Sequence, residues 1–222
     1  MFLQSTFLLT WSALLAGTIF TSIILQKKIK SKQNANPNPN ANVTQNKKTK
    51  ILALDLVIHV IAFLFYTYII FVSQFKSYRN LRYLDWTLTT PLLLYILIVF
   101  ANERINGVQL TGIFTLLFLM LFCGWVGGNT FSTSYLLGFL FFVALFAALY
   151  RLLFKVKNVN DAVAENKQRD QKKKIKMLFI FSAVVWGLYG AAYLLNFKLR
   201  NIMYNILDLI SKVIFGIWVS FI

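Results

Sequence analysis

Seven apolar segments, each about as long as a bilayer-spanning helix, alternate along the chain with polar connections. We place them at about 2–26, 51–75, 80–101, 107–127, 132–155, 175–197 and 200–222. An α-helix needs roughly 20 residues to cross the hydrocarbon core of a bilayer. The alternation of apolar and polar positions that a membrane β-barrel requires is weak. The pattern predicts an all-α membrane protein, a seven-helix bundle that forms a single domain over residues 1–222.

The composition supports a membrane environment. Hydrophobic residues make up 58% of the chain and charged residues only 14%. A soluble domain of this length cannot bury that much apolar surface, so lipid must be the solvent for most of it. We therefore expect an integral, multi-pass membrane protein whose first partner is the bilayer.

The excess of basic residues follows the connections between segments. The net charge is +16, and most lysines and arginines lie within 27–50 and 155–176. By the positive-inside rule both connections are cytoplasmic, which puts the N-terminus outside and the C-terminus inside. The positive charge is explained by this topology, and we expect no nucleic-acid partner. The Asn-rich stretch within 27–50 predicts a flexible linker, whereas 155–176 has a composition that allows the adjacent helices to continue.

A few charged residues lie inside the apolar segments. Lys212 is near the middle of the last segment, where an unpaired charge costs several kcal/mol. Asp208 precedes it by four residues and shares its helical face. In the third segment Arg82 precedes Asp85 by three residues. A structural ion pair would explain Lys212 and Asp208. A desolvated lysine that forms an imine with an aldehyde is the alternative.

Four stretches resemble microbial (type 1) rhodopsins. "RYLDWTLTTPLLL" (82–94) resembles their third helix, and "LDLISKVIFG" (207–216) resembles their seventh. "WGLYGAAY" (186–193) is similar to the sixth helix and "IAFLFY" (61–66) to the second. The resemblance covers nearly the whole chain. It implies all-trans retinal bound to Lys212 as a protonated Schiff base, and ion transport or light sensing without enzymatic catalysis or a metal site.

The resemblance also implies roles for the charged residues. Asp85 and Asp208 would form a paired counterion that keeps the proton on the Schiff base, with Asp85 accepting that proton after light isomerises retinal. Arg82 would balance the remaining negative charge. Thr89, one turn from Asp85, and Tyr66 would donate hydrogen bonds to the counterions. Further residues would line retinal: Trp86, Thr90, Leu93, Trp186, Tyr189 and Tyr193.

Two positions, Ile96 and Gly190, depart from the family's pattern, and the second segment carries a polar pair. Ile96 stands seven residues after Thr89, where pumps carry a carboxylate that returns a proton to the Schiff base. Asp55 and His59 lie four apart on one face of the second segment. They would relay protons or line a water-filled ion path, unless Asp55 is only an interfacial residue. Gly190 stands where the sixth helix usually has proline.

Three functions remain open at this stage. The function expected first is a light-gated cation channel, which is favoured by the missing carboxylate, by the polar pair on the second segment and by the basic linker. An outward proton pump with slow turnover is favoured by Asp85 with Thr89. A photosensor that signals through a partner is the third reading. The transported species would be cations or protons, and the family resemblance implies a homo-oligomer.

Overall fold

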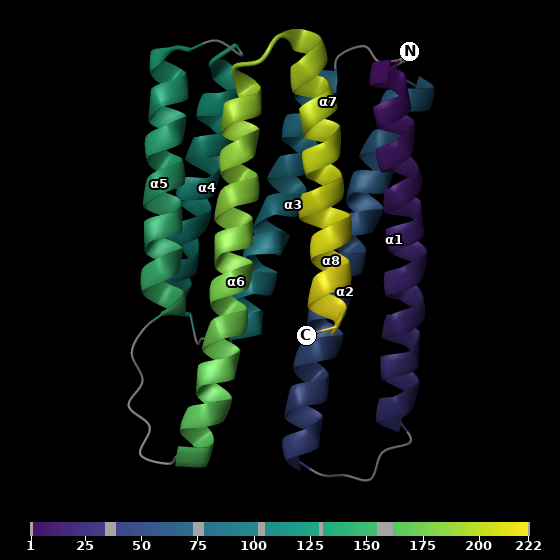
Figure 1. Ribbon diagram of the computed structural model, residues 1–222, viewed down its shortest axis with the longest axis vertical. Coiled ribbons are helices and arrows are strands. Elements are labelled where there is room, and N and C mark those ends of the chain that lie inside the picture. Colours follow the sequence, from purple (N-terminus) through teal and green to yellow (C-terminus); the bar gives the residue numbers. More distant parts are fainter. Residues whose placement is uncertain are drawn as a thin grey trace. The chain divides into compact units, whose positions relative to one another are not determined.

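The computed structural model describes residues 2–33, 39–72, 78–101, 105–128, 131–154 and 162–221, and all the elements in these ranges are helices. They are α1 (Phe2–Gln33), α2 (Pro39–Thr67), the π-helix η1 (Tyr68–Val72), α3 (Tyr78–Ala101), α4 (Gly107–Val126), α5 (Thr133–Leu153), α6 (Ala162–Tyr193), α7 (Phe197–Asp208), the π-helix η2 (Leu209–Ile214) and α8 (Phe215–Phe221) (Figure 1). Within the described ranges, seven helical runs are long and apolar enough to cross a membrane. The seven predicted spans are confirmed.

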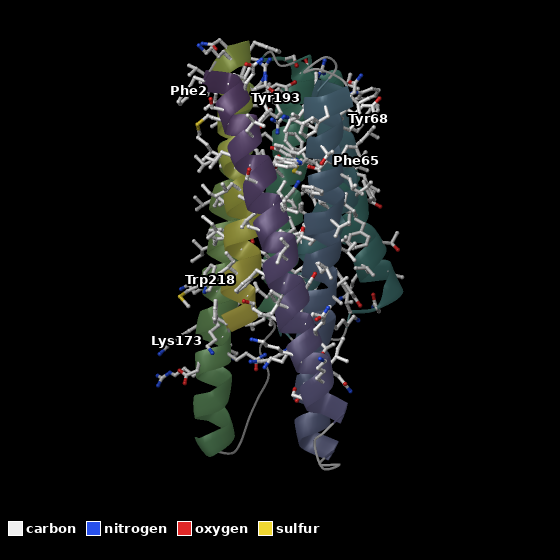
Figure 2. All side chains as sticks on the ribbon, turned by 90° about the vertical axis from the view of Figure 1, so that its right-hand side faces the viewer. Phe2, Phe65, Tyr68, Lys173, Tyr193 and Trp218 are labelled. Atoms are coloured by element: carbon white, nitrogen blue, oxygen red, sulfur yellow. The ribbon has the colours of Figure 1, made fainter. Side chains whose placement is uncertain are left out.

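The chain divides into two compact units. The first comprises residues 1–96 and 195–222, and the second comprises 97–194. In the first unit α1 packs against α2, α7, η2 and α8, and α2 also contacts η2 and α8. Figure 2 shows Phe2, at the start of α1, near the top of this unit and Trp218, in α8, well below it. In the second unit α5 packs against α4 and α6.

The last span changes its helical form around Lys212. α7, η2 and α8 follow one another as a single run, and Figure 1 shows them as one continuous column. Within it the Phe215 amide bonds to the carbonyl of Ile210, five residues earlier. π-turns of this kind are rare and occur frequently at functional sites. Lys212 therefore projects from a locally widened turn.

The third span continues through a proline. Pro91 lies inside α3 and has no amide hydrogen to give to the preceding turn. Nearby hydroxyls bond to carbonyls of the same helix: Thr87 donates to Tyr83 at 2.6 Å and Thr90 to Trp86 at 2.6 Å. Neither of these is the Thr87 carbonyl, which is the one that the missing amide hydrogen of Pro91 would have bonded. α3 thus presents residues 82–93 as one uninterrupted surface.

The first two helices extend into the connection that the sequence predicted to be a linker. α1 continues to Gln33 and α2 begins at Pro39, so the expectation of a flexible stretch over 32–50 is wrong for 32–33 and 39–50, while 34–38 lie outside the described residues. The lysines and glutamines here are good helix formers, and proline suits a first helical position. Gln45 also joins the two helices by donating to the Lys28 carbonyl at 3.1 Å.

The sixth helix extends in the predicted way. α6 begins at Ala162, so most of 155–176 continues the span, and 155–161 lie outside the described residues. α6 also continues through Gly190, the position of the family's proline. The Tyr135 hydroxyl of α5 donates to the Gly190 carbonyl at 3.3 Å. A side chain from a neighbouring helix therefore bonds to the backbone at this position.

Candidate functional site

Lys212 lies in the first unit against two carboxylates. Its Nζ is 2.5 Å from Asp85 Oδ2 and 3.9 Å from Asp208 Oδ1. Lys212 and Asp85 are each 1% exposed, and Asp208 is 0% exposed. Such charges persist in a dry interior only when they are paired and hydrogen-bonded. The partners that the sequence predicted for Lys212 are the ones that surround it.

Arg82 completes a group of four charges. Its Nη1 is 3.1 Å from Asp208 Oδ2, and its Nη2 donates to Asn205 Oδ1. The guanidinium carbon also lies 5.0 Å from the centre of the Phe7 ring and 5.7 Å from that of Tyr204, within cation–π range. Two cations and two anions bring the cluster to a net charge of zero. Arg82 pairs directly with Asp208, although it is closer to Asp85 along the chain.

The two carboxylates differ in how firmly they are held. Asp208 accepts hydrogen bonds from Arg82, from the Tyr66 hydroxyl at 2.7 Å and from the Trp86 indole at 3.1 Å. Asp85 accepts from Lys212, while the Thr89 hydroxyl bonds mainly to the Asp85 backbone carbonyl at 2.8 Å and lies 3.4 Å from Oδ1. Hydrogen bonds to a carboxylate stabilise its ionised form. Asp85 is therefore the better placed of the two to accept a proton.

Asn205 ties this cluster to α1. It is 0% exposed, its Oδ1 accepts from Tyr66 at 3.1 Å as well as from Arg82, and its Nδ2 donates to Thr6 Oγ1 at 2.8 Å. Its backbone carbonyl accepts from the Thr10 hydroxyl at 3.0 Å. Our sequence analysis missed Asn205. The available signal was a polar residue three positions before Asp208 inside an apolar span.

We expect Asn205→Ala to lower the free energy of unfolding by about 1–3 kcal/mol, because it removes the buried amide that accepts from Arg82 and donates to Thr6. Thermal unfolding in detergent would measure the change. The exposed Gln4, in the first turn of the same α1 helix, supplies the control variant Gln4→Ala. Equal unfolding temperatures for the two variants would show that Asn205 does not hold the cluster.

The predicted retinal-lining residues divide between the two units. Trp86, Thr90 and Leu93 are buried on α3 in the first unit, on the same helix as Asp85. The other three lie on α6 in the second unit: Trp186, Tyr189 and Tyr193. Tyr193 is buried there and donates to the Gly124 carbonyl at 3.1 Å. Their role toward retinal remains a prediction.

Asp55 and His59 are both buried on α2, each 1% exposed. His59 Nδ1 is 2.9 Å from the Asp55 carbonyl oxygen and 3.4 Å from Asp55 Oδ2, and the Thr21 hydroxyl donates to Oδ2 at 3.0 Å. This burial is the opposite of what a merely interfacial aspartate would show. Ile96, where the family's pumps carry a carboxylate, is also buried.

The cluster around Lys212 fits an aldehyde cofactor such as retinal. A lysine amine condenses with an aldehyde, and the product keeps a positive charge only where negative groups balance it. Asp85 and Asp208 lie within 2.5 and 3.9 Å of Nζ and supply that balance. The site thus supplies the amine and the two negative charges that such a cofactor requires.

Comparisons with known proteins identify the family of this chain. A sequence model described as "Bacteriorhodopsin-like protein" matches residues 39–221. Opsin-1 of Neurospora crassa is 28% identical over 149 residues, which are 62% of this chain and 47% of Opsin-1, so the chain spans about half the length of that relative.

Solved structures share the fold. The viral rhodopsin OLPVRII is 27% identical with a TM-score of 0.75, covering 99% of this chain and 96% of that one. The proton-pumping rhodopsin AR2 of Acetabularia acetabulum is 18% identical with a TM-score of 0.75, covering 98% and 92%. The family match spans most of the chain, including all four charged residues of the cluster. This chain belongs to the bacteriorhodopsin-like family of microbial rhodopsins.

Proposed function

We propose that this protein moves ions across the membrane in response to light, with outward proton pumping as the function that its geometry supports best. The observation that carries the proposal is the 2.5 Å contact between Lys212 Nζ and Asp85 Oδ2. A donor and an acceptor at hydrogen-bond distance are placed for direct proton transfer. The orientation proposed is the one from the charge pattern, with the N-terminus outside.

Retinal, when bound through Lys212, supplies the absorption of light and a change of shape that alters the proton affinity of the lysine nitrogen. The chain provides the rest. Lys212 holds a proton between two carboxylates, and Trp86, Thr90 and Leu93 provide apolar surface next to Asp85 on α3. That the α6 residues Trp186, Tyr189 and Tyr193 also contact retinal follows only from the family resemblance.

The charges of the cluster remain balanced during the proposed step. Before transfer, Arg82 and the Lys212 nitrogen are positive, and Asp85 and Asp208 are negative. When the proton crosses to Asp85 Oδ2, the Lys212 nitrogen and Asp85 both become neutral. Arg82 and Asp208 then balance each other at 3.1 Å. No uncompensated charge is left in the dry interior, where it would be costly.

A light-gated cation channel is the second candidate. The observation in its favour is the polar group of Asp55, His59 and Thr21, buried between α1 and α2. Buried polar groups in a membrane span mark ion paths as well as proton relays. In this alternative, light would open a hydrated path past Asp55.

Voltage-clamped photocurrents in retinal-supplied cells would separate the candidates. We expect an outward current at every membrane potential, because a pump draws on light and not on the ion gradient. A current that reverses sign with the cation gradient would establish a channel instead. A coloured protein that passes no current would contradict transport and would leave a photosensor.

A further inference from the structure

We propose that Tyr135 and Tyr193 act together as a clasp that fixes the C-terminal end of α6. Tyr135 is then a positioning residue for the α6 side chains that the family resemblance places against retinal. This second statement rests on the proposed function, whereas the clasp itself rests on contacts within the second unit. We call the two side chains the tyrosine clasp.

Tyr193 joins the end of α6 to the end of α4. Its hydroxyl donates to the Gly124 carbonyl at 3.1 Å. Gly124 lies in the last turn of α4, which ends at Val126, and the carbonyls of a last turn lack regular partners within their own helix. A Cβ placed on Gly127 would lie 2.5 Å from the Tyr193 hydroxyl oxygen. Glycine at this position therefore leaves the room that the hydroxyl occupies.

Tyr135 joins the end of α6 to the start of α5. Its hydroxyl donates to the Gly190 carbonyl at 3.3 Å, and Gly190 lies in the last turn of α6. The Tyr135 amide donates to Oγ of Ser132, the N-cap residue of α5, at 3.3 Å. An N-cap side chain satisfies an amide that the first turn of a helix leaves unbonded. Tyr135 is thus held through its backbone as well as through its hydroxyl.

The two tyrosine rings pack on each other. Their centroids are 5.3 Å apart and their planes are inclined by 25°, which is a stacked arrangement. Such aromatic pairs attract each other beyond the burial of their area. Tyr193 bonds to α4 and Tyr135 bonds to α6, so a movement of the α6 end against α4 or α5 would break a hydrogen bond or the stack. Figure 1 shows the end of α4, the start of α5 and the end of α6 at the same end of the second unit.

The clasp lies close to all the α6 residues that the resemblance assigns to retinal. Trp186, Tyr189 and Tyr193 fall within about the last two turns of α6. A site whose side chains are fixed before the ligand arrives loses less freedom on binding and holds the ligand more firmly. Tyr135 therefore affects the proposed site through α6, and not as one of the residues proposed to line it.

Amide hydrogen exchange of the protein without retinal tests the clasp. We expect the amides of residues 190–194 to exchange about 2–10-fold faster in Tyr135→Phe than in the native protein, the effect of losing one hydrogen bond of ordinary strength. Tyr150→Phe is the matched control, because Tyr150 lies on the same helix and is 56% exposed. Equal exchange in the two variants at 190–194 would overturn the clasp.

A steric variant tests the other half of the clasp with both tyrosines in place. Gly127→Ala should push the Tyr193 hydroxyl away from Gly124 and speed exchange at the end of α6. Gly112→Ala, also on α4, is the control, because no atom lies within 4 Å of its Cβ position. Native exchange in Gly127→Ala would show that the bond to α4 does not hold α6. Simple additivity in the double variant Gly127→Ala/Tyr135→Phe would reveal two separate contacts instead of one clasp.

The retinal-loaded protein tests the positioning role. We expect Tyr135→Phe to stay coloured, to change its absorption maximum, and to lose colour to hydroxylamine in the dark about 2–10-fold faster, again the effect of one hydrogen bond. Tyr150→Phe should match the native protein in both measurements. A Tyr135→Phe protein with the native maximum and the native bleaching rate would overturn the positioning role, even with faster exchange. A native protein that takes up no retinal would instead contradict the proposed function, and the exchange result would still decide on the clasp.

Discussion

Lys212→Ala should abolish the visible absorbance that retinal confers, because the variant has no amine at the only buried site where the described chain pairs a lysine with two carboxylates. The measurement is an absorption spectrum of the purified protein after incubation with retinal. Lys173→Ala is the control, since Lys173 is 70% exposed and projects from α6 (Figure 2). A coloured Lys212→Ala protein would refute the assignment of Lys212.

Loss of colour must be distinguished from loss of fold. Removing Lys212 leaves Asp85 without its cation, and breaking a buried pair costs about 3–5 kcal/mol. Lys212→Arg addresses this difficulty, because guanidinium retains a positive charge but is a poor partner for an aldehyde. We expect Lys212→Arg to remain closer to native stability and still to be colourless. Thermal unfolding of both variants beside their spectra would separate the two effects.

The pair of Lys212 and Asp208 could be predicted because charge is expensive in an apolar span, whereas Asp85 and Arg82 were joined to it only through the resemblance to microbial rhodopsins. Lys212, Asp208 and Asp85 each stand out against the residues around them, and helical spacing places the first two on one face. Helix length and hydropathy were sufficient for the seven spans. These signals are local in the sequence, so no tertiary information was needed to find them.

The rest of the site depends on contacts between distant segments. Thr6 and Asn205 are 199 residues apart, and nothing in the sequence around either residue predicts their hydrogen bond. In the sequence Gly17 and Gly216 look like ordinary small residues. Only the structure shows that His59 packs against Gly17 and Asp55 against Gly216. The Trp86 indole was expected to line retinal and also donates to Asp208. The π-turn at Lys212 has no sequence signal that we can name.

Asp85→Asn should nearly abolish light-driven transport, because the amide cannot take up the proton that leaves Lys212. We expect the photocurrent to fall by roughly 100-fold or more, the scale of a lost acid–base group. The absorbance should also move to longer wavelength, because the negative charge closest to the positive nitrogen is lost. Photocurrent and spectrum of the same preparation would test both. Asp170→Asn, at a 74% exposed residue, is the control.

Asp208→Asn should behave differently, and the difference tests the assignment of roles. Asp208 accepts hydrogen bonds from Arg82, Tyr66 and Trp86, so replacing it disturbs three buried donors at once. Asp85 has fewer partners, and its loss should disturb the fold less. We therefore expect Asp208→Asn to unfold at a lower temperature than Asp85→Asn. If Asp208→Asn instead kept native stability and lost only transport, Asp208 and not Asp85 would be the proton acceptor.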